Sequence, residues 1–296
     1  MAGSLQKSEL DFRLHHGKCL QNEKSRAALA SATNSALSNF ALRHSVGLGL
    51  YRAKNYIENG SGTLFEIESH YFIATAAHCI RKLDLDQIRV AYRETKYSDQ
   101  FILVKKGALG GTGGDPYDVG YLELDRSVIG DTSAEFLTID QIALDYDPTQ
   151  SLVFLFGFPS ELVPKDEAIE QRRFRLRSLG LLTVVSIGNT LPDCVDGSID
   201  IVLAYPEQAP SGAETQSYSV PDPEGISGGG IWIYNPNLAS PITGSHDARF
   251  IGIQKSWLKQ KRLVLGNKVI GFLRLLARDY PDIRDTLNCK FGPILG

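Results

Sequence analysis

The sequence predicts an all-β protein built from two sets of short strands. Glycine supplies 28 of the 296 residues, which suits a chain with many tight turns. Short apolar or alternating runs bounded by turn residues recur over 45–124 and again over 152–253, and this spacing is typical of a barrel or a sandwich. A polar, irregular stretch at 126–150 separates the two sets, and we expect it to be the connection between them.

Each set contains six candidate strands. Those of the first set are expected at residues 46–51, 62–67, 71–75, 88–92, 101–104 and 119–124. Those of the second set are expected at residues 152–156, 173–177, 182–187, 199–203, 230–234 and 249–253. Residues 206–223 are rich in Ser, Gly, Glu and Pro, and this composition predicts a long loop.

The two ends of the chain differ from its middle. An alanine-rich stretch with leucines at helical spacing predicts a helix within 23–42, and an amphipathic pattern predicts another at 267–278. The helical N-terminal extension either packs on the back of the domain, which is the simpler interpretation, or serves as a docking arm for a regulatory protein partner. We expect domain boundaries that give the extension at 1–44, a first strand domain at 45–130, a connection at 131–150 and a second strand domain with the C-terminal helix at 151–296.

Composition narrows the classes of partner. The chain is 43% hydrophobic and 22% charged, which are ordinary values for a globular protein. A net charge of −3 argues against a nucleic-acid partner held by bulk charge. No apolar stretch is long enough to span a bilayer, and the N-terminus has no apolar signal region. We therefore expect a cytoplasmic protein without a membrane partner.

The four cysteines, Cys19, Cys79, Cys194 and Cys289, are scattered along the chain. Neither a CxxC pair nor a His/Cys cluster is present to indicate zinc. We expect no metal and no other cofactor.

The most informative stretch is 223–232, Pro-Glu-Gly-Ile-Ser-Gly-Gly-Gly-Ile-Trp, in which Ser227 lies among four glycines. Glycine allows unusual backbone conformations, so a serine in such a turn can present its hydroxyl while nearby N–H groups converge on one spot. Acyl transfer needs this combination of a nucleophile and donors for the oxyanion. By itself, the stretch would be interpreted as a glycine-rich turn before a buried strand.

Two further residues lie at the edges of apolar runs. His78 ends the run at 72–78, and Asp118 opens the run at 118–124, Asp-Val-Gly-Tyr-Leu-Glu-Leu. A histidine, an aspartate and a serine thus follow one another along the chain. Because Asp115 is close and turns favour aspartate, a turn-forming role for Asp118 is an alternative.

Together these motifs resemble those of chymotrypsin/trypsin-like serine proteases. Thr-Ala-Ala-His-Cys at 75–79 is similar to the family's histidine motif, Gly-Ile-Ser-Gly-Gly at 225–229 to its nucleophile motif, and 118–124 to its aspartate strand. The order His, Asp, Ser is also that of chymotrypsin. The resemblance covers roughly residues 45–270 and implies two six-stranded antiparallel β-barrels closed by a C-terminal helix.

The resemblance implies a role for each residue. Ser227 would attack a peptide carbonyl, His78 would accept and return the proton, and Asp118 would orient His78. The backbone N–H groups of Gly225 and Ser227 would form the oxyanion hole. Ser61 also lies between two glycines, but it precedes the histidine strand, where the family has no nucleophile. The walls of the substrate pocket would be Asp222, Gln254, Lys255, Ser256 and Trp257.

The chain departs from the family at two places. Trypsin-type zymogens have an aspartate at the position of Ile226, which pairs with a newly cut N-terminus, and isoleucine cannot make that pair. Activation by N-terminal cleavage is therefore not expected, and the site is either formed constitutively or ordered by a partner or ligand. Secreted relatives also pair the cysteine after the histidine with one on the preceding strand. Here that strand, 60–67, has none, so Cys79 cannot form this bridge, which fits a reducing compartment.

We therefore predict a trypsin-like serine endopeptidase that cleaves protein or peptide substrates in the cytoplasm. Two alternatives remain. One is a catalytically inactive protease-fold module that binds peptides. The other is a protease effector that a partner activates through the N-terminal helical extension.

Overall fold

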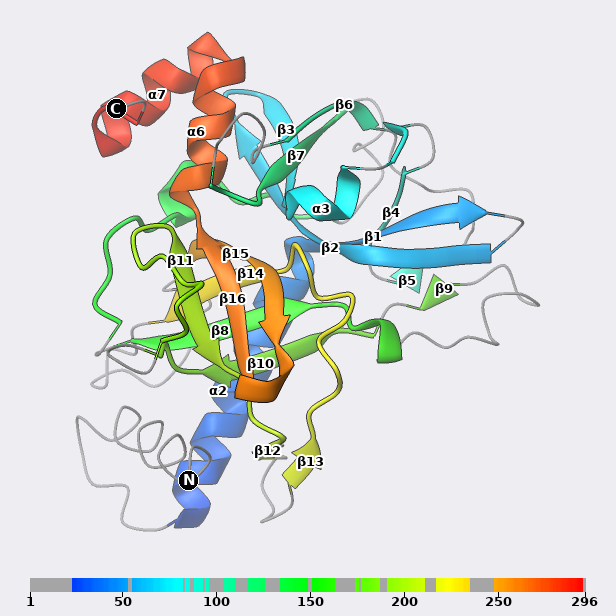
Figure 1. Cartoon of the computed structure of the whole chain (residues 1–296), viewed down its shortest axis with the longest axis vertical. Helices are drawn as coiled ribbons and strands as arrows, with labels where there is room; N and C mark the ends of the chain where they lie inside the picture. Colours follow the sequence, from blue (N-terminus) through cyan, green and yellow to red (C-terminus); the bar gives the residue numbers. More distant parts are fainter. Residues whose placement is uncertain are drawn as a thin grey trace.

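Two six-stranded antiparallel sheets dominate the computed structural model of the chain (Figure 1). Both sheets are antiparallel and curled, so the predicted fold class of two six-stranded antiparallel β-barrels is confirmed. The structure describes residues 23–52, 55–81, 83–85, 88–92, 94–95, 104–109, 116–125, 134–148, 151–162, 174–175, 177–186, 191–210, 217–234 and 248–294.

The first sheet has the strand order β4-β1-β2-β3-β7-β6. Its strands are β1 (Ser45–Arg52), β2 (Asn55–Ile67), β3 (His70–Thr75), β4 (Ile88–Ala91), β6 (Val104–Leu109) and β7 (Gly120–Leu124). The end of β3 pairs with the start of β7, where Thr75 lies opposite Gly120. This register brings the segment after β3 next to the segment before β7, and these segments contain His78 and Asp118.

The second sheet has the order β10-β8-β14-β15-β16-β11. Its strands are β8 (Leu152–Gly157), β10 (Leu179–Thr183), β11 (Asp200–Ala204), β14 (Gly230–Tyr234), β15 (Ala248–Leu258) and β16 (Leu263–Lys268). β14 begins directly after the Ser227 loop and is held on both sides, because Gly230 pairs with Phe156 of β8 and with Ile253 of β15. The loop is therefore attached to the centre of the sheet.

Successive side chains of a strand point to opposite faces of the sheet and pack into separate apolar cores. In β8, Val153 and Leu155 point into the core of the second sheet, whereas Phe154 and Phe156 point to a larger core shared with the helices. That larger core is rich in aromatic side chains, and Trp232 meets Phe250 edge to face at 5.1 Å. Because both faces of β8 are covered, its sequence is a continuous apolar run.

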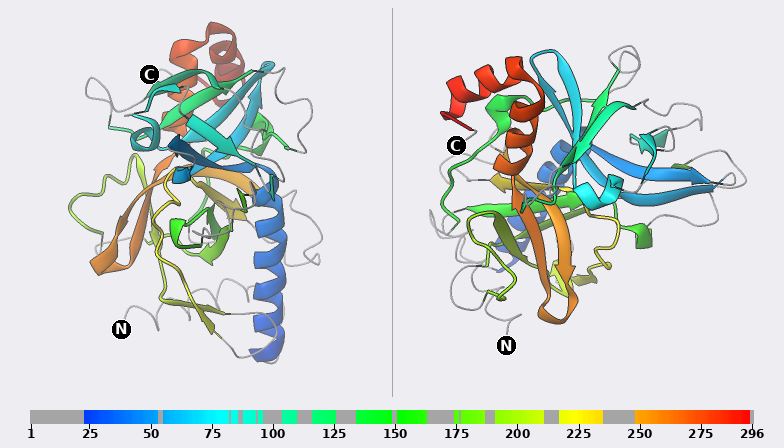
Figure 2. Two further views of the ribbon diagram at one scale, coloured as in Figure 1. Left: turned by 90° about the vertical axis from the view of Figure 1, so that its right-hand side faces the viewer. Right: turned by 45° about the horizontal axis from the view of Figure 1, so that its top comes forward.

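The N-terminal helix α2 (Glu23–Arg43) packs along the second sheet against β8 and β10 (Figures 1 and 2). Its Leu37, Phe40 and Ala41 are buried in the aromatic core. Phe40 meets Trp232 edge to face at 5.4 Å. The described part of the extension thus lies on the body of the protein, while residues 1–22 lie outside the described residues.

The C-terminus differs from the single helix predicted at 267–278. α6 (Ile270–Asp279) and α7 (Pro281–Phe291) follow one another, because Pro281 cannot continue the first helix but is well suited to begin a second. Residues 267 and 268 belong to β16, a strand that we did not predict. Its pairing with β11 and β15 overrides the local helical pattern.

Three further details of the strand prediction were wrong. The predicted strand at 173–177 does not join the second sheet: β9 (Phe174–Arg175) pairs with β5 (Glu94–Thr95) in a separate two-stranded sheet. β10 begins three residues before the predicted 182–187. The predicted loop at 206–223 contains a hairpin of β12 (Gln208–Pro210) and β13 (Ser217–Ser219). The first two differences follow from pairing with other segments of the chain, which local patterns do not show, whereas the third is a local hairpin.

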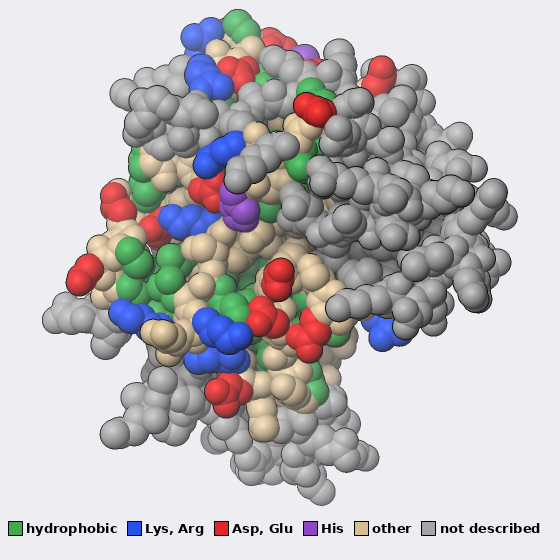
Figure 3. All heavy atoms as spheres, turned by 45° about the vertical axis from the view of Figure 1, so that its right-hand side comes forward, with side chains coloured by type: hydrophobic (Ala, Val, Ile, Leu, Met, Phe, Trp, Pro, Cys, Tyr) green, Lys and Arg blue, Asp and Glu red, His purple; other side chains and the backbone are tan. Residues whose placement is uncertain are grey.

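The described surface carries mixed charge. On the face in Figure 3, acidic and basic side chains lie interspersed among the described residues. Within the described part of the chain, no helix combines the length and apolar character needed to cross a membrane.

We predict that Phe40→Ala lowers the free energy of unfolding by about 3–5 kcal/mol, because it empties a filled site between α2 and Trp232. Chemical denaturation followed by circular dichroism measures the change. Asn39→Ala, on the exposed side of the same helix, is the matched control and should change stability by less than about 0.5 kcal/mol. Equal stability of the two variants would show that the helix does not belong to the folded body.

Candidate active site

His78 lies on a single helical turn at the end of β3. This turn, α3 (Ala77–Ile80), is tied to the start of β7: the Ala77 N–H donates to the Asp118 carbonyl at 3.2 Å. The His78 N–H donates to Asp118 Oδ1 at 3.0 Å. The apolar side chains of the turn are buried, whereas the imidazole is 43% exposed. The two strands therefore hold a histidine and an aspartate side by side at the surface.

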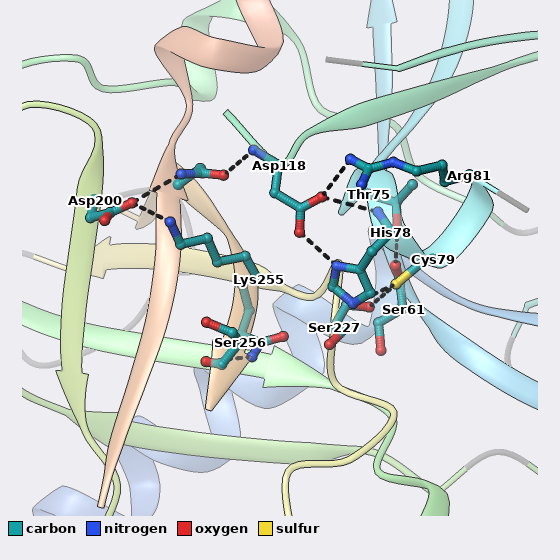
Figure 4. A network of polar contacts seen from close by, with 12 residues as sticks. Ser61, Thr75, His78, Cys79, Arg81, Asp118, Asp200, Ser227, Lys255 and Ser256 are labelled. Atoms are coloured by element: carbon teal, nitrogen blue, oxygen red, sulfur yellow. Dashed lines mark hydrogen bonds and ion pairs between the residues drawn. The ribbon is translucent and has the colours of Figure 1, made fainter. Parts of the chain in front are cut away.

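The imidazole and the carboxylate are themselves hydrogen-bonded, because His78 Nδ1 and Asp118 Oδ2 lie 2.6 Å apart (Figure 4). Arg81 lies 3.6 Å from the other carboxylate oxygen. The backbone N–H of Asp118 donates to Asn267 Oδ1 at 2.7 Å. The structure thus brings these two predicted site residues together, while Asp115 lies outside the described residues.

This arrangement stabilises the charged forms of both side chains. The hydrogen bond with Asp118, followed by the contact with Cys79, raises the pKa of His78 from 6.5 to about 10, against the opposing effect of burial. Burial acts to raise the pKa of Asp118, but the hydrogen bonds and positive charge of His78 outweigh it and lower that pKa below its usual value. Both shifts favour the imidazolium–carboxylate form of the pair.

Glycine is required at two positions of the Ser227 loop. Gly225 and Gly228 have φ angles of +90° and +87°, in the region that other residues rarely adopt. A Cβ atom on Gly228 would also collide with the Ser61 carbonyl and the Thr75 hydroxyl. The glycine-rich motif thus has a local structural reason as well as a chemical one.

The peptide groups around Gly225 are fixed on both sides. The Glu224 carbonyl accepts from the Ser160 N–H at 2.8 Å. The Ser61 hydroxyl donates to the Gly225 carbonyl and accepts from the Phe158 N–H, both at 2.9 Å. In a trans peptide the N–H points opposite to the carbonyl, so the Gly225 N–H points away from Ser160. Within the described residues it donates no hydrogen bond.

The N–H of Ser227 is held in the same way. The Ile226 carbonyl accepts from the Gly229 N–H at 2.7 Å, so the Ser227 N–H points away from Gly229. The Ser227 carbonyl accepts from the Ser61 N–H, also at 2.7 Å. Like the N–H of Gly225, that of Ser227 has no acceptor in the described part of the chain. The loop therefore presents two N–H donors of fixed direction, and they are the two that were predicted to form an oxyanion hole.

Cys79 connects the two halves of the site. Its sulfur lies 3.7 Å from His78 Nε2 and 3.4 Å from the Ser227 carbonyl, to which it donates (Figure 4). The His78 ring and the Ser227 backbone therefore both contact the Cys79 sulfur. Among the described contacts, no hydrogen bond joins the Ser227 hydroxyl to the His78 ring.

The surroundings of Cys79 explain why it forms no disulfide. It is buried and not bonded to another cysteine, and a Cβ atom on Gly60 would lie 2.6 Å from its sulfur. Gly60 thus lies where a cysteine partner would have to stand, on the strand that the sequence showed to lack one. Cys194 and Cys289 are also free, and Cys19 lies outside the described residues.

Ile226 anchors the loop by apolar burial. It is fully buried in the core of the second sheet with Leu155 and Ile231. It also packs closely on β8, because a Cβ atom on Gly157 would lie 2.8 Å from Ile226 Cγ2. Burial of a side chain of this size typically contributes about 1.5–3 kcal/mol. Because the side chain at position 226 is uncharged, its burial needs no positively charged partner such as a newly cut N-terminus.

Gln254 bonds to the Ser227 loop, and Ser256 bonds to the side chain of Gln254. The Gln254 N–H donates to the Gly229 carbonyl at 2.9 Å, and the Gln254 carbonyl accepts from the Gly228 N–H at 2.8 Å. Its buried side chain donates through Nε2 to the Ser256 carbonyl at 3.1 Å. This part of β15 therefore supports the Ser227 loop directly.

The other predicted pocket residues make pairs of their own. Asp222 lies at the surface, 3.6 Å from Lys259, which in turn lies over the ring of Trp257 at 5.4 Å from its centroid. Lys255 forms an ion pair with Asp200 at 2.6 Å. The negative charge of Asp222 is therefore shared with a cation of this chain.

Sequence reasoning missed three residues that shape the site: Ser61, Asp200 and Asn267. The flanking glycines of Ser61 were a visible signal, but they did not indicate a bond to a loop 164 residues away. Asn267 fell in a stretch that predicted a helix, and its partner Asp118 is 149 residues distant. Among the described residues, no group of three or more His, Cys, Asp or Glu side chains could hold a metal ion.

No protein-family model and no curated protein matches the sequence. Among solved structures, the fold is similar to that of an inactivated protease paralogue of the scabies mite, with 14% sequence identity and a TM-score of 0.47. The match covers 82% of this chain and 95% of the mite protein. At this level of likeness, the mite protein's lack of activity says nothing about whether the present chain is active.

We predict that Asp118→Asn shifts the titration of His78 to lower pH, because the amide removes the hydrogen bond and charge that raise the pKa of the imidazole. NMR of the ring protons against pH measures the midpoint. Asp193→Asn, at an exposed turn, is the control and should leave it unchanged. A midpoint that does not move in a folded Asp118→Asn protein would contradict the pairing.

The same variant should alter the pH dependence of stability. The pKa of His78 is higher in the folded protein, so its stabilising contribution is complete below pH 6.5 and is lost as the pH rises through about 10. Thermal melts across this range should therefore fall less steeply with pH for Asp118→Asn than for the unmodified chain.

Proposed function

We propose that the chain is a serine endopeptidase that cleaves peptide bonds through an acyl-enzyme intermediate. The observation that carries this proposal is the Ser227 loop, which presents two N–H groups without acceptors among the described residues next to a hydrogen-bonded His78–Asp118 pair. A fixed pair of donors beside a serine and a histidine is the arrangement that acyl transfer needs.

In the proposed reaction, Ser227 Oγ forms a bond to the substrate carbonyl carbon, and His78 Nε2 accepts the hydroxyl proton. The carbonyl oxygen becomes an oxyanion that accepts from the N–H groups of Gly225 and Ser227. His78 then gives its proton to the leaving amine as the C–N bond breaks. A water molecule hydrolyses the resulting ester by the same steps, and Asp118 stabilises the imidazolium throughout.

Two features of the site set the conditions for this reaction. The raised pKa of His78 favours the imidazolium, so the unprotonated base that starts the reaction becomes more abundant as the pH rises. His78 Nε2 must also exchange its contact with the Cys79 sulfur for the Ser227 hydroxyl. Catalytic hydrogen bonds often tighten only when substrate is bound.

The loop supports activity without N-terminal cleavage. Ile226 is held by apolar contacts, and the two peptides that carry the donors are fixed by the Ser160 and Gly229 N–H groups, so the donors are in place without an added positive charge. We infer a constitutively formed site in a chain that works in a reducing compartment, because Cys79 has Gly60 opposite it.

A peptide-binding module without catalysis is a second candidate. The observation that favours it is that, among the described contacts, none joins the Ser227 hydroxyl to the His78 ring. The chain would then bind an extended peptide at this site, while Ser227 would remain unreactive.

We predict that a fluorophosphonate probe labels the chain at Ser227 and that Ser227→Ala abolishes both labelling and hydrolysis. The expected loss in kcat is on the order of 10⁶-fold, the scale found for the nucleophile of another serine protease. Mass spectrometry of the labelled peptide identifies the site, and thermal melts confirm that the variant folds. A folded parent chain that neither reacts with the probe nor cleaves peptides, yet binds them, would favour the binding module.

We predict that Ser61→Ala lowers kcat by roughly 10- to 100-fold with little change in KM, because the Gly225–Ile226 peptide, which lies between the two proposed oxyanion donors, loses the hydroxyl that its carbonyl accepts from. The variant also leaves the buried Phe158 N–H without its acceptor, which should cost about 1–3 kcal/mol of stability. Steady-state kinetics and denaturation measure the two effects. Ser35→Ala, on the exposed side of α2, is the control.

A further inference from the structure

A buried asparagine connects the proposed catalytic aspartate to an ion pair inside the second sheet. Asn267, at the end of β16, is fully buried. Its Oδ1 accepts from the backbone N–H of Asp118 at 2.7 Å, and its Nδ2 donates to Asp200 Oδ1 at 3.1 Å. One side chain thus joins the start of β7 in the first sheet to β11 in the second.

The Asp200 carboxylate is held from three sides. Its Oδ1 also accepts from Lys255 Nζ at 2.6 Å, and its Oδ2 accepts from the Asp196 N–H at 3.1 Å. The side chains of Asp200 and Lys255 are 2% and 17% exposed, so their ion pair is largely removed from water. Figure 4 shows Lys255 pointing toward Asp200, with Asp118 on the far side of the network. Charges buried in this way remain fixed only while both partners are present.

The chemistry of these groups allows one orientation of the Asn267 amide. The backbone N–H of Asp118 can only donate, and the carboxylate of Asp200 can only accept, so the amide must turn its oxygen to Asp118 and its nitrogen to Asp200. An aspartate at this position would have no hydrogen for Asp200, and a leucine would serve neither partner. The site therefore requires an amide side chain.

We propose that Asn267 is the positioning residue for Asp118, and that the Asp200–Lys255 ion pair fixes the amide that does this. The proposal rests on the proposed function and adds to it the group that sets the position of the third catalytic residue. By fixing the backbone at Asp118, Asn267 sets the place from which the carboxylate reaches His78. Lys255 then acts within the fold, through Asp200, as a support of the active site.

The test compares the unmodified chain with Asn267→Leu, a variant of similar size that removes both hydrogen bonds. In ¹H NMR, the low-field Nδ1–H resonance of His78 reports its hydrogen bond with Asp118, and the ring protons report the titration of His78. We expect Asn267→Leu to weaken or abolish the low-field resonance and to shift the titration midpoint to lower pH. Lys268→Met, which removes a lysine of the same strand that bonds to the Gly197 carbonyl, should change neither.

Kinetics supply a second measurement. If the chain hydrolyses peptides or esters as proposed, Asn267→Leu should lower kcat by up to about 100-fold with KM nearly unchanged, because the substrate does not touch Asn267. If the parent chain is inactive, the proposed function fails, but the NMR comparison still decides whether Asn267 positions Asp118. Unaltered NMR signals in a folded Asn267→Leu protein would overturn the proposal.

A measurement on the unmodified chain covers the case in which Asn267→Leu does not fold. A backbone N–H bonded to a buried amide oxygen exchanges slowly with solvent. Hydrogen exchange followed by NMR should therefore show the Asp118 amide to be protected to the level of amides within β7. Exchange at the rate of an open loop would overturn the proposal without any variant.

Discussion

The arrangement of the site depends on the contact that Ser61 makes between the two sheets. Ser61 lies within β2 of the first sheet, and it bonds to the Ser227 carbonyl through its N–H and to the Gly225 carbonyl through its hydroxyl. Its own carbonyl accepts from the Thr75 hydroxyl near the end of β3. One buried residue therefore sets the position of the nucleophile loop relative to the strand that leads to the histidine.

The polar groups of the site are held by residues from both sheets. The His78–Asp118 pair belongs to the first sheet, but its backbone anchor, Asn267, belongs to the second. Asp200 and Lys255 satisfy the far end of that anchor. Because an unpaired charge or polar group costs several kcal/mol when buried, such a network is stable only when all its members are present.

Apolar packing keeps these contacts in register. The core between the sheets is filled by aromatic rings, among them Phe65, which meets Phe250 edge to face at 5.0 Å and joins the two sheets. Helix α2 closes one side of this core through Phe40, and α6 contributes Phe272. Close-packed protein interiors resist displacement. The polar contacts at the edge of the core are therefore held in fixed positions.

The sequence by itself determined the strand-rich middle of the chain, one helix near each end and the residues that the proposed chemistry would use. Strand alternation and glycine-rich turns are local signals, and the motifs around His78, Asp118 and Ser227 are contiguous. Only the tertiary structure showed that β16 is a strand, that Ile226 is anchored by apolar burial, and that Ser61 and Asn267 hold the site. The contacts of Ser61 and Asn267 join partners more than a hundred residues apart, while β16 and Ile226 depend on pairing with β11 and on packing against β8, and no local pattern encodes such partners.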